Sequence, residues 1–170
     1  MRIQRLIKPY NREKALQYAN QWALKRNPSY YDFSEIGGDC TNYISQCLYA
    51  GSLVMDYTQD TGWYYVNLNR RAPAWTGVPF LYRYLTRNYI SPGPFGKEVD
   101  VSEIEIGDII QLAFYKDRDF GHSLFVVQHG NPPTIDNILI NTHTTDRYYY
   151  PLREYYWDRI RFIRIVGVYS

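Results

Sequence analysis

The sequence predicts an α+β fold in which N-terminal helices pack on an antiparallel β-sheet. In the first third of the chain, apolar residues recur at intervals of three and four, as on the buried face of an α-helix. The second half contains short apolar runs separated by turn residues, which is typical of strands. Such short connections favour antiparallel pairing, because parallel strands need a long crossover. The chain has 170 residues, the size of one domain, so we predict a single domain over residues 1–170.

Three helices are predicted. The first follows Asn11 as its N-cap and ends near Arg26. The second runs from Cys40 to about residue 50, where Gly51 would stop it. Residues 52–76 keep neither the helical nor the strand period, so we predict an ordered but irregular segment rich in aromatic rings. A third, short helix is predicted at about residues 79–88.

About five strands are predicted in the second half of the chain, at residues 109–115, 123–128, 138–142, 148–152 and 160–169. His122 leads the second of these strands. If the second and third strands form a hairpin centred on residues 132–133, His122 lies directly opposite His143 on one face of the sheet. Asn141 would share that face and reach His122 only diagonally.

Charge and composition exclude several kinds of protein. The formal net charge is +2 and no block of like charges occurs, which argues against nucleic-acid binding through phosphate contacts. The two cysteines, Cys40 and Cys47, lie about two helical turns apart, too far for a disulfide and too few for a cysteine-rich zinc site. No apolar run is long enough to span a membrane, and the first ten residues lack the apolar core of a signal peptide.

The segment Gly37-Gly38-Asp39-Cys40 predicts a reactive thiol at the start of a helix. The two glycines allow a tight turn with positive φ, and Asp39 is a good N-cap. Cys40 would then lie at the positive end of the helix dipole, which lowers the pKa of a thiol and favours the nucleophilic thiolate. Cys47 falls on the apolar face of the same helix, so we predict that it belongs to the core.

These placements give a candidate catalytic group of Cys40, His122 and His143. Cys40 would be the nucleophile, His122 its base, and His143 would hold the His122 ring in the useful tautomer. Asn141 is the alternative third residue, since its amide oxygen can accept from an imidazole N–H. The same cysteine and two histidines could instead bind zinc, which takes thiolate and imidazole ligands.

Aromatic side chains are more numerous than a core of this size needs, with 19 Tyr and 4 Trp. Amphipathic rings on a surface suit sugars, peptides or a partner protein. We therefore consider a substrate rim near the thiol, with packing inside the irregular segment as the alternative for each ring. The rim candidates are Asp39, Tyr30, Tyr31, Trp63, Tyr64, Tyr65 and Trp75.

Four motifs carry a resemblance to a known family. In order they are Gly38-Asp39-Cys40-Thr41-Asn42, Gly107-Asp108-Ile109-Ile110-Gln111, His122-Ser123 and His143-Thr144-Thr145-Asp146. From Tyr10 to Leu152 the chain resembles the putative amidase domain of bacterial cell-wall proteins. That group looks like a branch of the NlpC/P60 papain-like cysteine peptidases.

The resemblance implies a papain-like fold with the Cys40 helix packed on the sheet. It also implies that Cys40 is the nucleophile, His122 the base and His143 the third polar residue. The implied reaction is hydrolysis, through a thioester, of an amide in a cell-wall peptide or in the link between that peptide and its sugar. No metal or organic cofactor is implied, and a cell-wall or extracellular location is expected. A non-catalytic module that binds cell-wall peptide on the same fold is the alternative.

Overall fold

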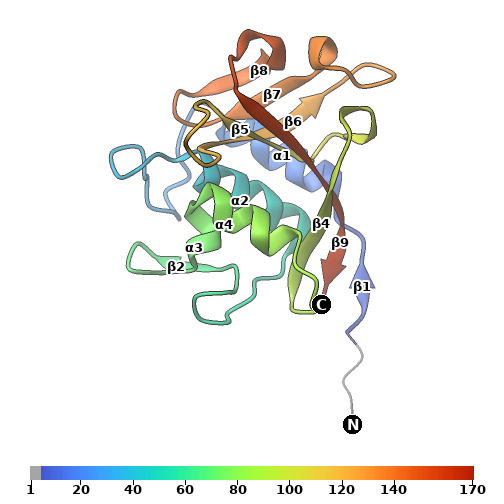
Figure 1. Ribbon diagram of the computed structural model, residues 1–170. Helices are drawn as coiled ribbons and strands as arrows, with labels where there is room; N and C mark the ends of the chain where they lie inside the picture. The colour runs from blue at the N-terminus through green and yellow to red at the C-terminus, as the bar shows by residue number, and fades with distance from the viewer. Residues whose placement is uncertain (1–4) are drawn as a thin grey trace.

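The computed structural model describes residues 5–170 and has the predicted α+β arrangement (Figure 1). The helices are α1 (Arg12–Trp22), α2 (Cys40–Ser52), α3 (Pro73–Thr76) and α4 (Val78–Leu85), and the 3-10 turns are η1 (Val101–Glu103), η2 (Ile135–Asn137) and η3 (Leu152–Glu154). The strands are β1 (Ile7–Lys8), β2 (Tyr65–Asn67), β3 (Arg70–Arg71), β4 (Gly93–Val99), β5 (Ile109–Ala113), β6 (His122–Gln128), β7 (Leu139–Thr142), β8 (Arg147–Pro151) and β9 (Arg159–Tyr169). The first ten residues, which were predicted to lack a signal-peptide core, include residues 1–4, and these four lie outside the described range. Within residues 5–170, no helix combines the length and the apolar character needed to cross a membrane.

The main sheet has the strand order β1-β9-β5-β6-β7-β8, with β4 also paired to β9. Every pairing in it is antiparallel, as predicted. The five predicted strands are β5 to β9. The sheet has seven strands rather than about five, because β9 is eleven residues long and pairs with β1 and β4 in addition to β5.

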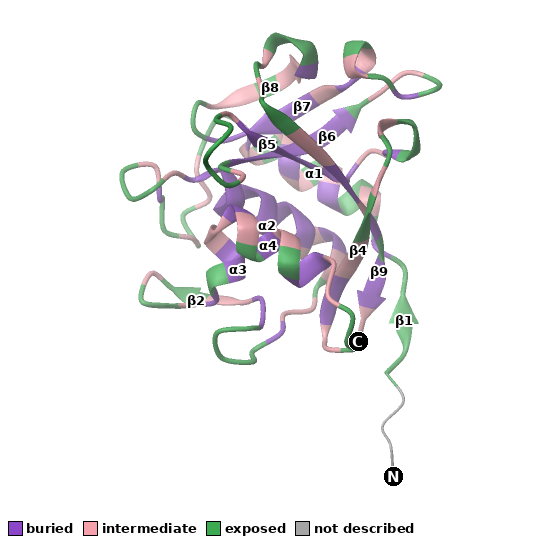
Figure 2. Ribbon diagram, viewed as in Figure 1, coloured by how far each residue is buried: buried purple, intermediate pink, exposed green. Residues whose placement is uncertain are grey.

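The sheet separates two apolar clusters, and alternate residues of its central strands enter one or the other. Helices α1 and α2 lie on the side that we call the helix face, where Phe125 of β6 joins side chains such as Ala19 and Ile44. On the opposite side, the outer face, Leu124 and Val126 of β6 join η3 and the ends of β7 and β9. Both the central strands and α2 are therefore almost wholly buried (Figure 2).

The helix boundaries follow local signals only in part. The side chain of Asn11 accepts from Lys14 N at 3.0 Å, so the predicted cap of α1 is confirmed, although α1 ends at Trp22. Helix α2 continues through Gly51 to Ser52 and is closed by Leu53 in the left-handed region at φ 57°, so Gly51 is not its stop. Gly51 instead allows close packing, because a Cβ there would lie 2.5 Å from Cε1 of Tyr10.

The segment predicted to be irregular contains more structure than the sequence indicates. Strands β2 and β3 form a small separate sheet, and α3 precedes the predicted third helix, which is α4. Trp63 and Trp75 are fully buried and their ring centroids lie 4.8 Å apart. The two tryptophans of this segment therefore belong to the core beside α2, where their indole N–H groups bind Ser45 and Asn42.

The predicted register between the second and third of the five strands is wrong by one residue. Phe125 faces Asn141 and Val126 faces Ile140, with an irregularity before Gln128. This register sets His143 opposite Ser123, not opposite His122. Because a shift by one residue turns side chains to the other face, His122 points to the outer face and His143 to the helix face.

Candidate active site

Cys40 is the first residue of α2, as predicted, and its side chain packs against the beginning of β6. The thiol is free, and the residue is 7% exposed. Its sulfur lies 3.8 Å from the Thr41 hydroxyl, which lies 3.0 Å from the Ser123 hydroxyl. The backbone N–H of Ser123 also faces the sulfur. The thiol is thus held beside the residue that follows His122 in the chain.

The pKa of the Cys40 thiol is raised, which contradicts the expectation of a lowered value. Burial is the largest cause, because a low-dielectric surrounding disfavours the thiolate. The Ser123 and Thr41 N–H groups and the Thr41 hydroxyl lower the pKa but do not outweigh burial, and the neighbouring Asp39 carboxylate raises it further. The resting sulfur is therefore a neutral thiol. Cys47 is fully buried and its pKa is raised well above its usual range, so its assignment to the core is confirmed.

His122 is the first residue of β6, and its ring lies between two aromatic rings of the outer face. The centroids of Phe114 and Tyr155 are each 5.9 Å from the ring centre. Burial lowers the pKa of His122 to about 4, so the imidazole is neutral at pH 7 and can accept a proton. Within residues 5–170 the ring makes no hydrogen bond, including none to Cys40.

His143 and Asn141 do not orient His122. The His143 ring stacks on Tyr43 with centroids 4.1 Å apart, and its Nε2 lies 2.7 Å from Trp22 O. The amide of Asn141 donates to Ala19 O and accepts from Tyr149 N. Both side chains therefore brace the helix face, and the predicted contact of either one with the base is wrong.

Asp39 is a buried polar centre and not an N-cap by its side chain. Its Oδ1 accepts from Phe33 N at 2.8 Å and from Asn42 Nδ2 at 2.9 Å. Its Oδ2 lies 2.5 Å from Nδ1 of His143 and 3.5 Å from Nε of Arg26. Trp22 O and the Asp39 carboxylate can both accept hydrogen bonds, so each ring nitrogen of His143 faces an acceptor.

The end of β7 is also tied to the residue before the thiol. The backbone N–H of Asp39 donates to the Thr144 hydroxyl at 2.9 Å. Gly38 has φ +101°, and the same threonine side chain lies 3.8 Å from where its Cβ would be. The positive φ of Gly37 and Gly38 agrees with the predicted glycine turn. This turn is thus fixed to the sheet, and with it the position of Cys40.

A cavity of about 160 Å³ opens beside this centre. Its lining residues are Phe114, His122, Thr144, Thr145, Arg147 and Tyr155. Tyr155 lies close enough to Cys40 for a charge on the sulfur to influence its hydroxyl, and burial raises the pKa of that hydroxyl to about 12. The sequence did not single out Tyr155 or Arg147, because neither belongs to a recognisable motif and both reach the site only through the fold of β8 and η3.

Most of the predicted rim residues do not form a rim. Trp63 and Trp75 are buried and bind Ser45 and Asn42 through their indole N–H groups, and Asp39 is buried as well. Tyr30 and Tyr65 pack on Trp75, each with a centroid separation of 6.0 Å. Tyr31, at 38% exposed, and the half-buried Tyr64 retain accessible ring surface.

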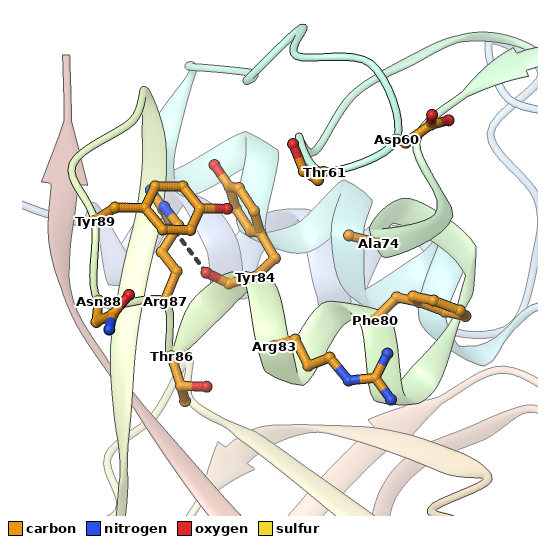
Figure 3. Close-up of a pocket in the computed structure, with 10 residues that line it drawn as sticks. All are labelled: Asp60, Thr61, Ala74, Phe80, Arg83, Tyr84, Thr86, Arg87, Asn88 and Tyr89. Carbon is orange, nitrogen blue, oxygen red and sulfur yellow. Dashed lines mark hydrogen bonds between the residues drawn. The ribbon is translucent and has the colours of Figure 1, made fainter.

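A second cavity, of about 600 Å³, lies between α4 and the loop that precedes Trp63 (Figure 3). Phe80, Tyr84 and Tyr89 supply its aromatic walls. None of its lining residues is a predicted catalytic residue. In the part of the chain that the structure describes, no three histidine, cysteine or acidic side chains gather as metal ligands, so Cys40, His122 and His143 do not converge as a zinc site requires.

The fold and the site together define an α+β domain with a buried thiol at a helix start and a neutral histidine at the head of the adjacent strand. The chain belongs to the family described as "Putative amidase domain", whose profile matches residues 9–166. It is 34% identical over 154 residues to "Uncharacterized protein YhbB" of Bacillus subtilis (strain 168), an alignment that covers 88% of this chain and 44% of that protein. It is 26% identical over 158 residues to "Uncharacterized protein YjcM" of the same organism, covering 88% and 34%. The chain thus spans less than half the length of these relatives, and no solved structure matches it.

Proposed function

We propose that this domain is a cysteine amidase that hydrolyses an amide of bacterial cell-wall peptide, or the link between that peptide and its sugar, on a papain-like scaffold. The observation that supports this most directly is the position of the Cys40 sulfur, which lies against Ser123, the residue that follows the neutral His122 in β6. Family membership supports amide hydrolysis, and the cell-wall substrate follows from the resemblance of the four motifs.

The protonation states support a reaction that starts from the neutral pair. As the Cys40 sulfur bonds to the substrate carbonyl carbon, His122 takes the thiol proton, so no isolated buried thiolate has to form. The backbone N–H of Cys40, at the start of α2, is a donor for the resulting oxyanion. His122 and the sulfur are not hydrogen-bonded in the substrate-free structure, and catalytic contacts of this kind often close only when substrate is bound.

The second half of the reaction uses the same two residues. The C–N bond breaks as His122 returns its proton to the leaving amine, which leaves a thioester on Cys40. His122 then takes a proton from water as the water oxygen attacks the thioester. The C–S bond breaks, the sulfur recovers the proton, and the acid product is released. No other group has to be oxidised or reduced.

The test is digestion of purified peptidoglycan fragments with mass spectrometry of the products. We expect hydrolysis by the natural chain, with one oxygen from labelled water in the new carboxylate. Cys40→Ala should lower kcat/KM by at least about 10³-fold, because the nucleophile is lost. The stability change should stay near 1 kcal/mol, since only one sulfur atom is removed.

Cys47→Ala is the matched control, because it removes the same atom from the same helix at a fully buried position. It should leave kcat/KM within a few-fold of the natural chain, although it should cost more stability. Hydrolysis that survives Cys40→Ala would contradict the thiol mechanism. Binding of the fragments without any cleavage would favour the non-catalytic module.

A further inference from the structure

The lining of the cavity beside Cys40 is positively charged, with no negative charge to balance it. Of its six lining residues, Arg147 alone carries a permanent charge, and none is acidic. His122 adds no charge at pH 7, because burial holds its pKa near 4. The remaining groups that can form hydrogen bonds are the hydroxyls of Thr144, Thr145 and Tyr155. The cavity is therefore suited to an anionic ligand group.

Arg147 has no carboxylate partner within residues 5–170. The adjacent Asp146 is occupied elsewhere, since both of its oxygens accept from Arg26 at 2.9 Å. The guanidinium carbon of Arg147 lies 4.4 Å from the ring centroid of Tyr150, and the same group lies near the Tyr155 hydroxyl. Stacking on a ring leaves the N–H groups at the guanidinium edge free to form hydrogen bonds.

The backbone holds this arginine in a fixed relation to the thiol. Arg147 is the first residue of β8 and pairs with Thr142 of β7. Two residues beyond Thr142, the Thr144 hydroxyl accepts from the backbone N–H next to Cys40. Arg147 and the residue before the nucleophile are therefore both attached to the short stretch of chain at residues 142–147.

We propose that Arg147 binds a carboxylate of the substrate next to the scissile amide, so that the site selects acidic peptides over neutral ones. This inference rests on the proposed function, because it assigns the substrate class of the same site. A guanidinium offers two parallel N–H groups to a carboxylate, which gives both charge and direction. The Tyr155 hydroxyl and the Thr145 hydroxyl stand beside it as further donors.

The test compares two forms of one probe. Purified cell-wall peptide fragments are used with their natural carboxylates and after conversion of those groups to carboxamides. Binding to the Cys40→Ala chain is measured by calorimetry, alone and combined with Arg147→Gln, Arg147→Lys or Arg153→Gln. Arg153 is the control because it lies in the neighbouring η3 but does not line the cavity.

We expect the acid form to bind Cys40→Ala about 10- to 100-fold more tightly than the carboxamide form, as for a hydrogen bond to a charged group. Arg147→Gln should reduce that ratio to near one, Arg147→Lys should keep part of it, and Arg153→Gln should leave it unchanged. Equal binding of the two forms, or a ratio that Arg147→Gln does not alter, would overturn the inference.

Turnover separates this inference from the proposed function. In the chain with Cys40 intact, Arg147→Gln should raise KM for the acid form by about the same factor and leave kcat within a few-fold, because the contact is uniform to substrate and transition state. Cleavage with no preference for the acid form would contradict the role of Arg147 but would agree with the proposed amidase activity. Acid-selective binding without cleavage by the natural chain would contradict the proposed amidase activity but would agree with the role of Arg147.

Discussion

The titration of His122 should be visible in the stability of the protein between pH 4 and 7. Its pKa falls from about 6.5 in an unfolded chain to about 4 in the folded one. Between these values the unfolded chain binds a proton that the native state does not bind. The stability linked to His122 is therefore complete above pH 6.5 and decreases as the pH falls toward 4.

We expect His122→Gln to remove this dependence. Urea unfolding measured from pH 4 to 7 should show a shallower loss of stability in the variant, with a difference of up to about 3 kcal/mol across the range. Other acidic and basic groups titrate alike in both chains, so their contributions cancel in the comparison. Parallel curves for the two chains would mean that the ring is not held neutral by burial.

The raised pKa of the Cys40 thiol also affects how readily the sulfur reacts, because the thiolate is the stronger nucleophile. A helix start can lower the pKa of a cysteine, but burial in apolar surroundings raises it, and Cys40 is buried beside the Asp39 carboxylate. Hydrogen bonds from the N–H groups of Ser123 and of Thr41, at the start of the helix, produce only a partial lowering of the thiol pKa. This lowering is outweighed by desolvation, which depends on packing that the local sequence does not reveal.

At the scale of elements, the turn before α2 is held by Asp39. Its carboxylate joins the backbone at Phe33, the side chain of Asn42 and the ring of His143, all in the interior. We expect Asp39→Ala to lower the free energy of unfolding by about 3 kcal/mol or more, because it leaves buried donors without an acceptor. Chemical denaturation measures this directly.

Two further variants separate charge from hydrogen bonding. Asp39→Asn should recover most of the loss, since its oxygen can accept from Phe33 N and its amide can donate to Nδ1 of His143. Asp146→Ala removes a carboxylate that pairs with Arg26 and is 29% exposed, so it should cost about 1 kcal/mol or less. Equal costs for Asp39→Ala and Asp146→Ala would show that the turn does not depend on the buried carboxylate.

The contact of α2 with the start of α1 gives another test. Alanine normally favours a helix interior over glycine by about 1 kcal/mol. At Gly51, however, a Cβ would lie 2.5 Å from the Tyr10 ring and 2.8 Å from Asn11 O. We therefore expect Gly51→Ala to lower stability by about 2 kcal/mol in thermal or chemical unfolding, since overpacking outweighs the helix preference.

Gly121→Ala is the matched control, because nothing lies within 4 Å of the added Cβ. It should change stability by no more than about 0.5 kcal/mol. A stabilising effect of Gly51→Ala would mean that α2 and the start of α1 can separate slightly without cost, so that close packing does not require glycine at this position.

At the scale of the whole molecule, the sequence predicted those elements whose signals are local. The Asn11 cap, the start of α2 at Cys40 and the five strands β5 to β9 all depend on neighbouring residues. Strand β4 was missed because Gly93, Pro94 and Gly96 resemble a loop. Its extended form is stabilised by pairing with β9, which is more than sixty residues away in the chain, as the facing residues Gly93 and Tyr169 show.

The candidate site was predicted less completely for a similar reason. Cys40 and His122 were placed in neighbouring elements from motif and periodicity alone. The role of His143 depended on a hairpin centred on residues 132–133, and the loop is not centred there. Gln128 pairs with Leu139 next to the loop, and beyond an irregularity Phe125 pairs with Asn141, one residue from the predicted register. Arg147 and Tyr155 reach the cavity only through tertiary packing, so no local sequence pattern predicts their place there.

The pairing of β1 with β9 determines how the domain responds to a pulling force. Ile7 faces Tyr169, and Ser170 N donates to Leu6 O, so both ends of the described chain leave from one corner (Figure 1). A tension between segments attached at the two ends would open these hydrogen bonds one after another, as in unzipping, instead of loading them together in shear. Because β1 has only two residues, it would be the first strand to separate from the sheet. The turn before α2 and the cavity beside it would keep their structure while β1 separates from β9.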